Sequence, residues 1–142
     1  MQQQAWARLA YPGAGTPEEL VRLAYRAFAN QDTQTLRAFC SGTIEVRPVD
    51  AFGLVGDTLS GFEAACRWVR HGAERGYQVT VWLRTLERVD DASVIGVGIV
   101  SERGSGCAAT VAWIWHVRGG LIDSVLGFSS EAEARRSCGL AA

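Results

Sequence analysis

The stretch of sequence that decides the fold reads CAATVAWIWHVRGGLIDSVLGF and spans residues 107–128. In its first half, side chains alternate between two faces, and Trp113 and Trp115 share one of them. This period of two predicts a half-buried strand. Gly119-Gly120 fits a tight hairpin turn, because glycine readily adopts the positive φ that such turns need. The stretch therefore predicts an antiparallel hairpin whose aromatic face points to the interior.

The same alternation precedes this hairpin. The sequence predicts an antiparallel meander of strands over residues 77–88, 92–103, 107–118 and 121–128. Asp90-Asp91 and Gly104-Ser105-Gly106 supply the turns between them. The parity of the first of these strands places Glu87 on the inner face, near the strand end.

Helix signals surround the meander. Thr16 caps a helix, Pro17 fits its first position and Glu19 completes a capping box, which predicts a helix over residues 17–29. The other predicted elements are a short helix after Asp32, a strand at 43–47, a helix from Gly61 to about residue 71, and a terminal helix that Ser130 and Glu133 begin.

This order of elements predicts an α+β fold, in which a cone-shaped, curved antiparallel sheet packs on the N-terminal helices. At 142 residues the chain has room for one domain. We expect a flexible tail over residues 1–15 and a single domain over residues 16–142.

Composition excludes several kinds of function. The net charge is −1 and every basic residue is arginine, so Schiff-base and P-loop lysine chemistry are excluded. The arginines form no basic patch, so we expect no nucleic-acid partner. No apolar run is long enough for a membrane span and no secretory signal is visible, so we expect a cytoplasmic protein. The four cysteines lack CxxC spacing, so we expect no metal.

The element order resembles the nuclear transport factor 2-like superfamily in its SnoaL-like branch, over about residues 16–140. The matching motifs are Tyr25-Arg26-Ala27-Phe28 with Asp32, Gly61-Phe62-Glu63-Ala64, Gly104-Ser105-Gly106, Ala112-Trp113-Ile114-Trp115, Arg118-Gly119-Gly120-Leu121-Ile122, Glu133-Ala134 and Gly139-Leu140. The resemblance implies a conical, barrel-like fold, a pocket between sheet and helices, small apolar ligands and often a homodimer. The superfamily includes ketosteroid isomerases, polyketide cyclases, epoxide hydrolases, dehydratases and proteins without catalysis.

The catalytic residues of the ketosteroid isomerases and epoxide hydrolases of that superfamily have no equivalents at the matching positions of this sequence. The base position of ketosteroid isomerase falls on Arg47, which stays protonated and cannot abstract a proton. The oxyanion acid falls on Trp113, and the oxyanion tyrosine falls on Ala24, one residue before Tyr25. The segments that match the charged relay of the epoxide hydrolases contain no carboxylate. We therefore expect neither of these mechanisms.

We expect a ligand pocket with aromatic walls. Its predicted lining residues are Tyr25, Arg47, Trp68, Trp113 and Trp115. For each tryptophan the alternative is core filling, and for Tyr25 it is a core ring whose hydroxyl reaches the surface. Arg47 either turns inward, where as a buried cation it needs an anionic ligand or Glu45, or lies outside in solvent.

The sequence leaves three functions open. The first is a small-molecule-binding protein with a hydrophobic pocket. The second is a cofactor-independent isomerase, cyclase or dehydratase acting on a polyketide- or steroid-like molecule through Asp50, Glu45 or Tyr25. The third is an interaction module with a filled interior.

The outer sheet face is a candidate dimer surface. Trp82 lies on an otherwise polar face of its strand, and with Ile114 and His116 it predicts a homodimer contact. The alternative is that the N-terminal tail covers this surface with Trp6 and Tyr11.

Overall fold

The computed structural model describes residues 15–67, 79–102 and 104–142. The predicted tail, apart from Gly15, lies outside these residues. So do Trp6, Tyr11, Trp68 and the second half of the helix that was predicted from Gly61. Of that helix, residues 62–67 are described and are helical.

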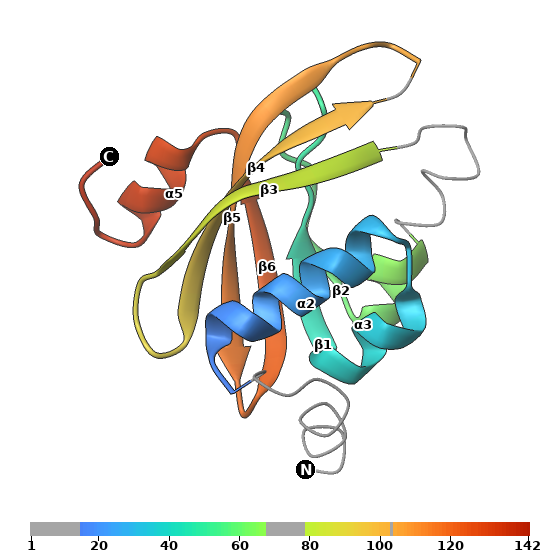
Figure 1. The fold of residues 1–142 in the computed structure, drawn as a ribbon, viewed down its shortest axis with the longest axis vertical. Coiled ribbons are helices and arrows are strands. Elements are labelled where there is room, and N and C mark those ends of the chain that lie inside the picture. The colour runs from blue at the N-terminus through green and yellow to red at the C-terminus, as the bar shows by residue number, and fades with distance from the viewer. Residues whose placement is uncertain (1–14, 68–78, 103) are drawn as a thin grey trace.

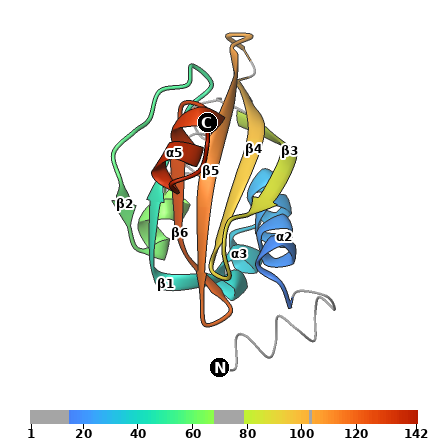
Figure 2. The same ribbon diagram turned by 90° about the vertical axis from the view of Figure 1, so that its left-hand side faces the viewer.

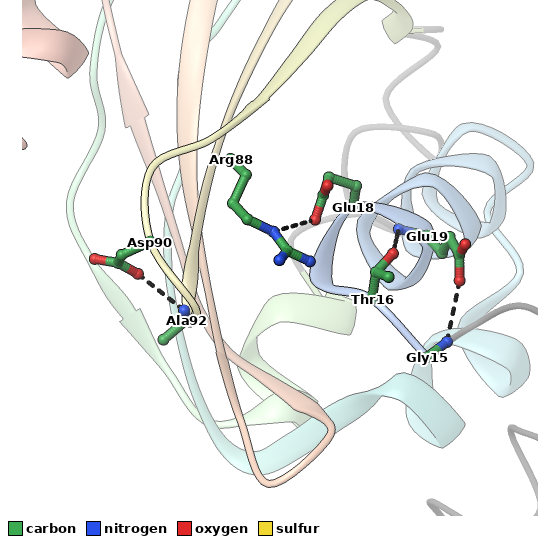
Figure 3. A network of polar contacts seen from close by, with 7 residues as sticks. All are labelled: Gly15, Thr16, Glu18, Glu19, Arg88, Asp90 and Ala92. Carbon is green, nitrogen blue, oxygen red and sulfur yellow. Dashed lines mark hydrogen bonds and ion pairs between the residues drawn. The ribbon is translucent and has the colours of Figure 1, made fainter.

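The N-terminal helices begin where their capping residues predict. Helix α2 spans Pro17–Ala29, and Thr16 accepts a hydrogen bond from the backbone N–H of Glu19 at 3.2 Å. The Glu19 carboxylate accepts from the N–H of Gly15 at 3.1 Å, one residue before the partner that a capping box predicts (Figure 3). Helix α3 spans Thr33–Phe39, and Asp32 caps it.

Over the described residues, the sheet contains six strands in the order β2-β1-β6-β5-β4-β3 and does not close into a barrel (Figure 1). The strands are β1 (Cys40–Arg47), β2 (Leu59–Ser60), β3 (Val79–Arg88), β4 (Ser93–Glu102), β5 (Ala108–Arg118) and β6 (Leu121–Phe128). The antiparallel meander from β3 to β6 confirms the prediction. Strand β1, however, pairs parallel with β6, so the sheet as a whole is mixed.

The two faces of the sheet are covered by different helices. Helices α2 and α3 pack on the inner face over the main core, whose fully buried members include Val21, Phe39 and Ile122. Helix α5 (Glu131–Ser137) lies on the opposite, outer face, as Figure 2 shows. There Ala134 packs in a second, smaller core. The predicted α+β cone therefore also has a helix on the outer face of its sheet.

A β-bulge in β3 exchanges the two faces on which the side chains after it lie. The register against β4 shifts between Leu83 and Thr85. Beyond the bulge, Arg88 turns inward and bonds Glu18 of α2 at 2.7 Å (Figure 3). Glu87 turns outward and pairs with Arg135 of α5. The inward orientation predicted for Glu87 was wrong, because strict alternation does not allow for an inserted residue.

Within the part of the chain that the structure describes, no helix is both long enough and apolar enough to cross a membrane.

Candidate functional site

A cavity lies between the inner face of the sheet and the N-terminal helices. Its volume is ≈ 90 Å³, several times the ~10–15 Å³ that a single water molecule needs. Helices α2 and α3, the segment 62–67 and strands β1, β4, β5 and β6 all contribute to its wall. The described lining residues are Tyr25, Phe28, Leu36, Cys40, Ile44, Val46, Arg47, Pro48, Val49, Phe62, Ala65, Cys66, Val100, Trp113, Trp115 and Val125. The wall is almost entirely apolar.

Three predicted site residues meet in one aromatic wall. The ring of Tyr25 stands edge-on to Trp113, with centroids 5.7 Å apart and planes at 83°. It lies 5.7 Å from the Trp115 ring at a tilt of 41°. All three are buried. They line the cavity and also fill the core. For Trp113 and Trp115 the two alternatives therefore do not exclude each other.

Two polar atoms of this wall have no hydrogen-bond partner among the described residues. The Tyr25 hydroxyl and the Trp115 indole N–H are buried, and neither makes a hydrogen bond within the described structure. They lie against strand β4, where Gly98 and Gly96 have no side chains to occupy the space. Burial raises the pKa of the Tyr25 hydroxyl well above its usual value. This phenol therefore stays protonated: it is a hydrogen-bond donor and not a base.

Arg47 lines the cavity, but its guanidinium group is engaged elsewhere. Its Nε donates to the carbonyl oxygen of Gly127 at 3.0 Å. The guanidinium carbon lies 4.6 Å from the centre of the Phe128 ring, which packs in the outer core. No ion pair with Glu45 is present among the described residues. Arg47 is therefore held by neutral partners and adds little polar surface to the cavity.

The cavity also contains two thiols that the sequence analysis did not assign to it. Cys40 and Cys66 are both buried in its wall. Burial raises the pKa of Cys40 to about 12, and the neighbouring Cys66 adds to the shift. At neutral pH the Cys40 thiol is protonated, so it is a poor nucleophile. The sequence holds no signal for this pairing, because the two residues come from different elements.

The two candidate carboxylates do not reach this cavity. Glu45 is exposed and lines a polar groove on the other side of the sheet. Asp50 is exposed, and its Oδ1 accepts from the backbone N–H groups of Phe52 and Leu54, each at 2.9 Å. Among the described residues that line the cavity there is consequently no carboxylate and no imidazole.

The predicted dimer surface is not continuous. Trp82 is 63% exposed, as its position on a polar face predicts. Ile114 is only 3% exposed, because it lies in the outer core that α5 covers. His116 is half-buried, and its Nδ1 bonds the hydroxyl of Ser93 at 3.0 Å. The expectation of one patch formed by all three was wrong with respect to Ile114, since helix α5 was not assigned to this face.

Comparison with solved structures identifies many with the same arrangement of helices and sheet. A nuclear transport factor 2-like protein from Burkholderia thailandensis is 27% identical, with a TM-score of 0.65 over 80% of this chain and 89% of that one. Bal32a, from a soil-derived mobile gene cassette, is 21% identical, with a TM-score of 0.66 over 89% and 88%. An epoxide hydrolase of the LEH-like type from M. tuberculosis is 16% identical, with a TM-score of 0.62 over 76% and 74%.

At such identities, structural similarity establishes the fold and leaves the role open. No family model matches the sequence. No curated protein matches it either.

Proposed function

We propose that this chain, which has the nuclear transport factor 2-like fold, binds a small neutral molecule of apolar character in the inner cavity. The observation that supports this most directly is the almost wholly apolar wall, in which aromatic rings stand beside aliphatic side chains. A hydrophobic ligand would remove further apolar surface from water, at roughly 25 cal/mol per Å² buried.

Binding without turnover fits the protonation states in the wall. General acid–base catalysis needs a group whose pKa lies near the working pH. Burial moves the pKa of Tyr25 and of Cys40 away from neutrality, and Glu45 and Asp50 lie outside the cavity. No observation favours an isomerase, cyclase or dehydratase role over simple binding.

The test uses N-phenyl-1-naphthylamine, a neutral fluorophore whose emission rises in apolar surroundings. We expect saturable binding to the purified chain. Ala65→Phe introduces a ring into the cavity wall and should weaken the binding by at least about tenfold, or ~1.4 kcal/mol.

The matched control is Ala29→Phe, at an exposed position near the end of α2. It should bind the fluorophore as the unmodified chain does. Absence of saturable binding, or equal binding by both variants, would contradict the proposal.

A further inference from the structure

A second hollow lies on the outer face of the sheet and is distinct from the inner cavity. It is a polar groove of ≈ 410 Å³ between β1, β5 and β6. The groove is lined by Thr43, Glu45, Ala92, His116, Val117, Arg118, Asp123 and Ser124. None of these described residues belongs to the wall of the inner cavity.

The strand register brings three polar side chains of this groove into one row. Glu45 of β1 is the Cα partner of Ser124 in β6, and Ser124 is the partner of His116 in β5. Neighbouring strands lie ~4.8 Å apart. A ligand atom above Ser124 is therefore within reach of all three side chains.

A hydrogen bond beneath the row orients the ring of His116. The hydroxyl of Ser93, which is only 4% exposed, lies 3.0 Å from His116 Nδ1. Because Nδ1 is engaged by this bond, Nε2 is the ring nitrogen left for a ligand in the groove that His116 lines. In the tautomer whose proton is on Nδ1, Nε2 is a hydrogen-bond acceptor.

The groove also has an uncompensated negative charge. The Asp123 carboxylate lies 3.4 Å from the Arg118 guanidinium, which offsets its charge. The Glu45 carboxylate pairs with no described residue. The row therefore consists of a carboxylate, a hydroxyl and an imidazole nitrogen, and each of these groups can accept a hydrogen bond.

We propose that this groove binds a primary ammonium group of a small amine. Such a group has three N–H donors and one positive charge. The donors match the Glu45 carboxylate, the Ser124 hydroxyl and His116 Nε2, and the charge matches Glu45. Charge-assisted hydrogen bonds of this kind are about twice as strong as neutral ones.

The test compares two probes of equal charge, butylammonium and butyltrimethylammonium, at constant ionic strength. The second has no N–H group. The chain has two histidines, so the His116 side-chain signals in an NMR spectrum are readily assigned with a His116→Gln variant. We expect butylammonium to shift these signals in a saturable way and butyltrimethylammonium to leave them in place.

Two variants test the row itself. Glu45→Gln keeps an acceptor but loses the charge, and it should weaken butylammonium binding about tenfold, or ~1.4 kcal/mol. Ser124→Ala should weaken it less. Glu131→Gln, an exposed carboxylate of α5 outside the groove, should change it less than about twofold.

Equal shifts with both probes would overturn the proposal, since plain electrostatic attraction explains that result. So would the absence of any shift, or an unchanged affinity in Glu45→Gln.

Discussion

The absence of a side chain at position 98 determines how closely α2 approaches the sheet. A Cβ atom built there would lie 2.4 Å from the carbonyl oxygen of Trp82 and 2.9 Å from the hydroxyl of Tyr25. In the sequence, Gly96-Val97-Gly98 resembles part of a glycine-rich dinucleotide-binding loop. It lies within a predicted strand and no helix follows it, so it cannot form such a loop. The structure shows why these glycines are needed: they leave the space that the aromatic wall occupies.

Gly98→Ala should therefore destabilise the protein. Its Cβ meets backbone and a buried ring, neither of which moves easily, so we expect a loss of about 2 kcal/mol or more in the free energy of unfolding. Chemical denaturation measures this loss. Gly42→Ala is the matched control, because no atom lies within 4 Å of its Cβ. A Gly98→Ala protein as stable as the control would refute the close packing described here.

The sequence predicts the position of Tyr25 on its helix but not the surroundings of its hydroxyl. Its place on the inward stripe of α2 follows from the spacing of apolar residues. The sequence left open whether its hydroxyl enters a pocket or reaches the surface. The hydroxyl does not reach the surface: it lies buried against β4 without a described partner. That outcome depends on Gly96 and Gly98 of β4, which lie more than seventy residues away in sequence, so no local pattern contains it.

Among the elements, the loop after β1 is held together by a single carboxylate. Asp50 accepts from two backbone N–H groups, and its own N–H donates to the carbonyl oxygen of Leu54. This arrangement fixes a loop in which Phe52 is 59% exposed and Leu54 is 66% exposed. Asp50, which was a candidate catalytic residue on the basis of the sequence, therefore has a structural role in this loop.

Asp50→Ala should lower the free energy of unfolding by about 2 kcal/mol, because two hydrogen bonds to a charged acceptor are lost. Asp50→Asn keeps an acceptor oxygen and should cost less than half as much. Thermal and chemical denaturation of both variants give the comparison. If both substitutions left the loop's amide exchange and the stability unchanged, Asp50 would have no such role.

Strand β3 shows where the alternation of side chains along a strand fails to predict the face on which a residue lies. At Trp82 and Leu83 the strand follows the predicted parity, and beyond the bulge Glu87 lies on the face opposite to the predicted one. A bulge depends on the fit between two strands, and the sequence of one strand does not reveal it. The helix starts, by contrast, were confirmed at Thr16, Asp32 and Ser130, since a cap bonds to residues three positions away.

For the whole molecule, self-association through Trp82 stays a prediction. An exposed indole on an edge strand favours a partner surface. If two copies meet there, light scattering should give a dimer mass, and Trp82→Arg should give a monomer mass with unchanged circular dichroism. Gly42→Ala is the control, because it lies on β1, near the opposite edge of the sheet from β3, and no atom lies within 4 Å of its Cβ. A dimer that Trp82→Arg leaves intact would place the contact elsewhere.

The sequence by itself determined the α+β class, the starts of three helices and the antiparallel meander, because caps, turns and period-two alternation act between residues close in the chain. Only the tertiary structure decided that β1 lies parallel to β6, that α5 covers the outer face, and that Cys40, Cys66 and the aromatic wall enclose one cavity. It also decided that Glu45 faces the outer groove. These features arise from contacts between distant segments, whose free energy depends on shape and burial that no single stretch of sequence encodes.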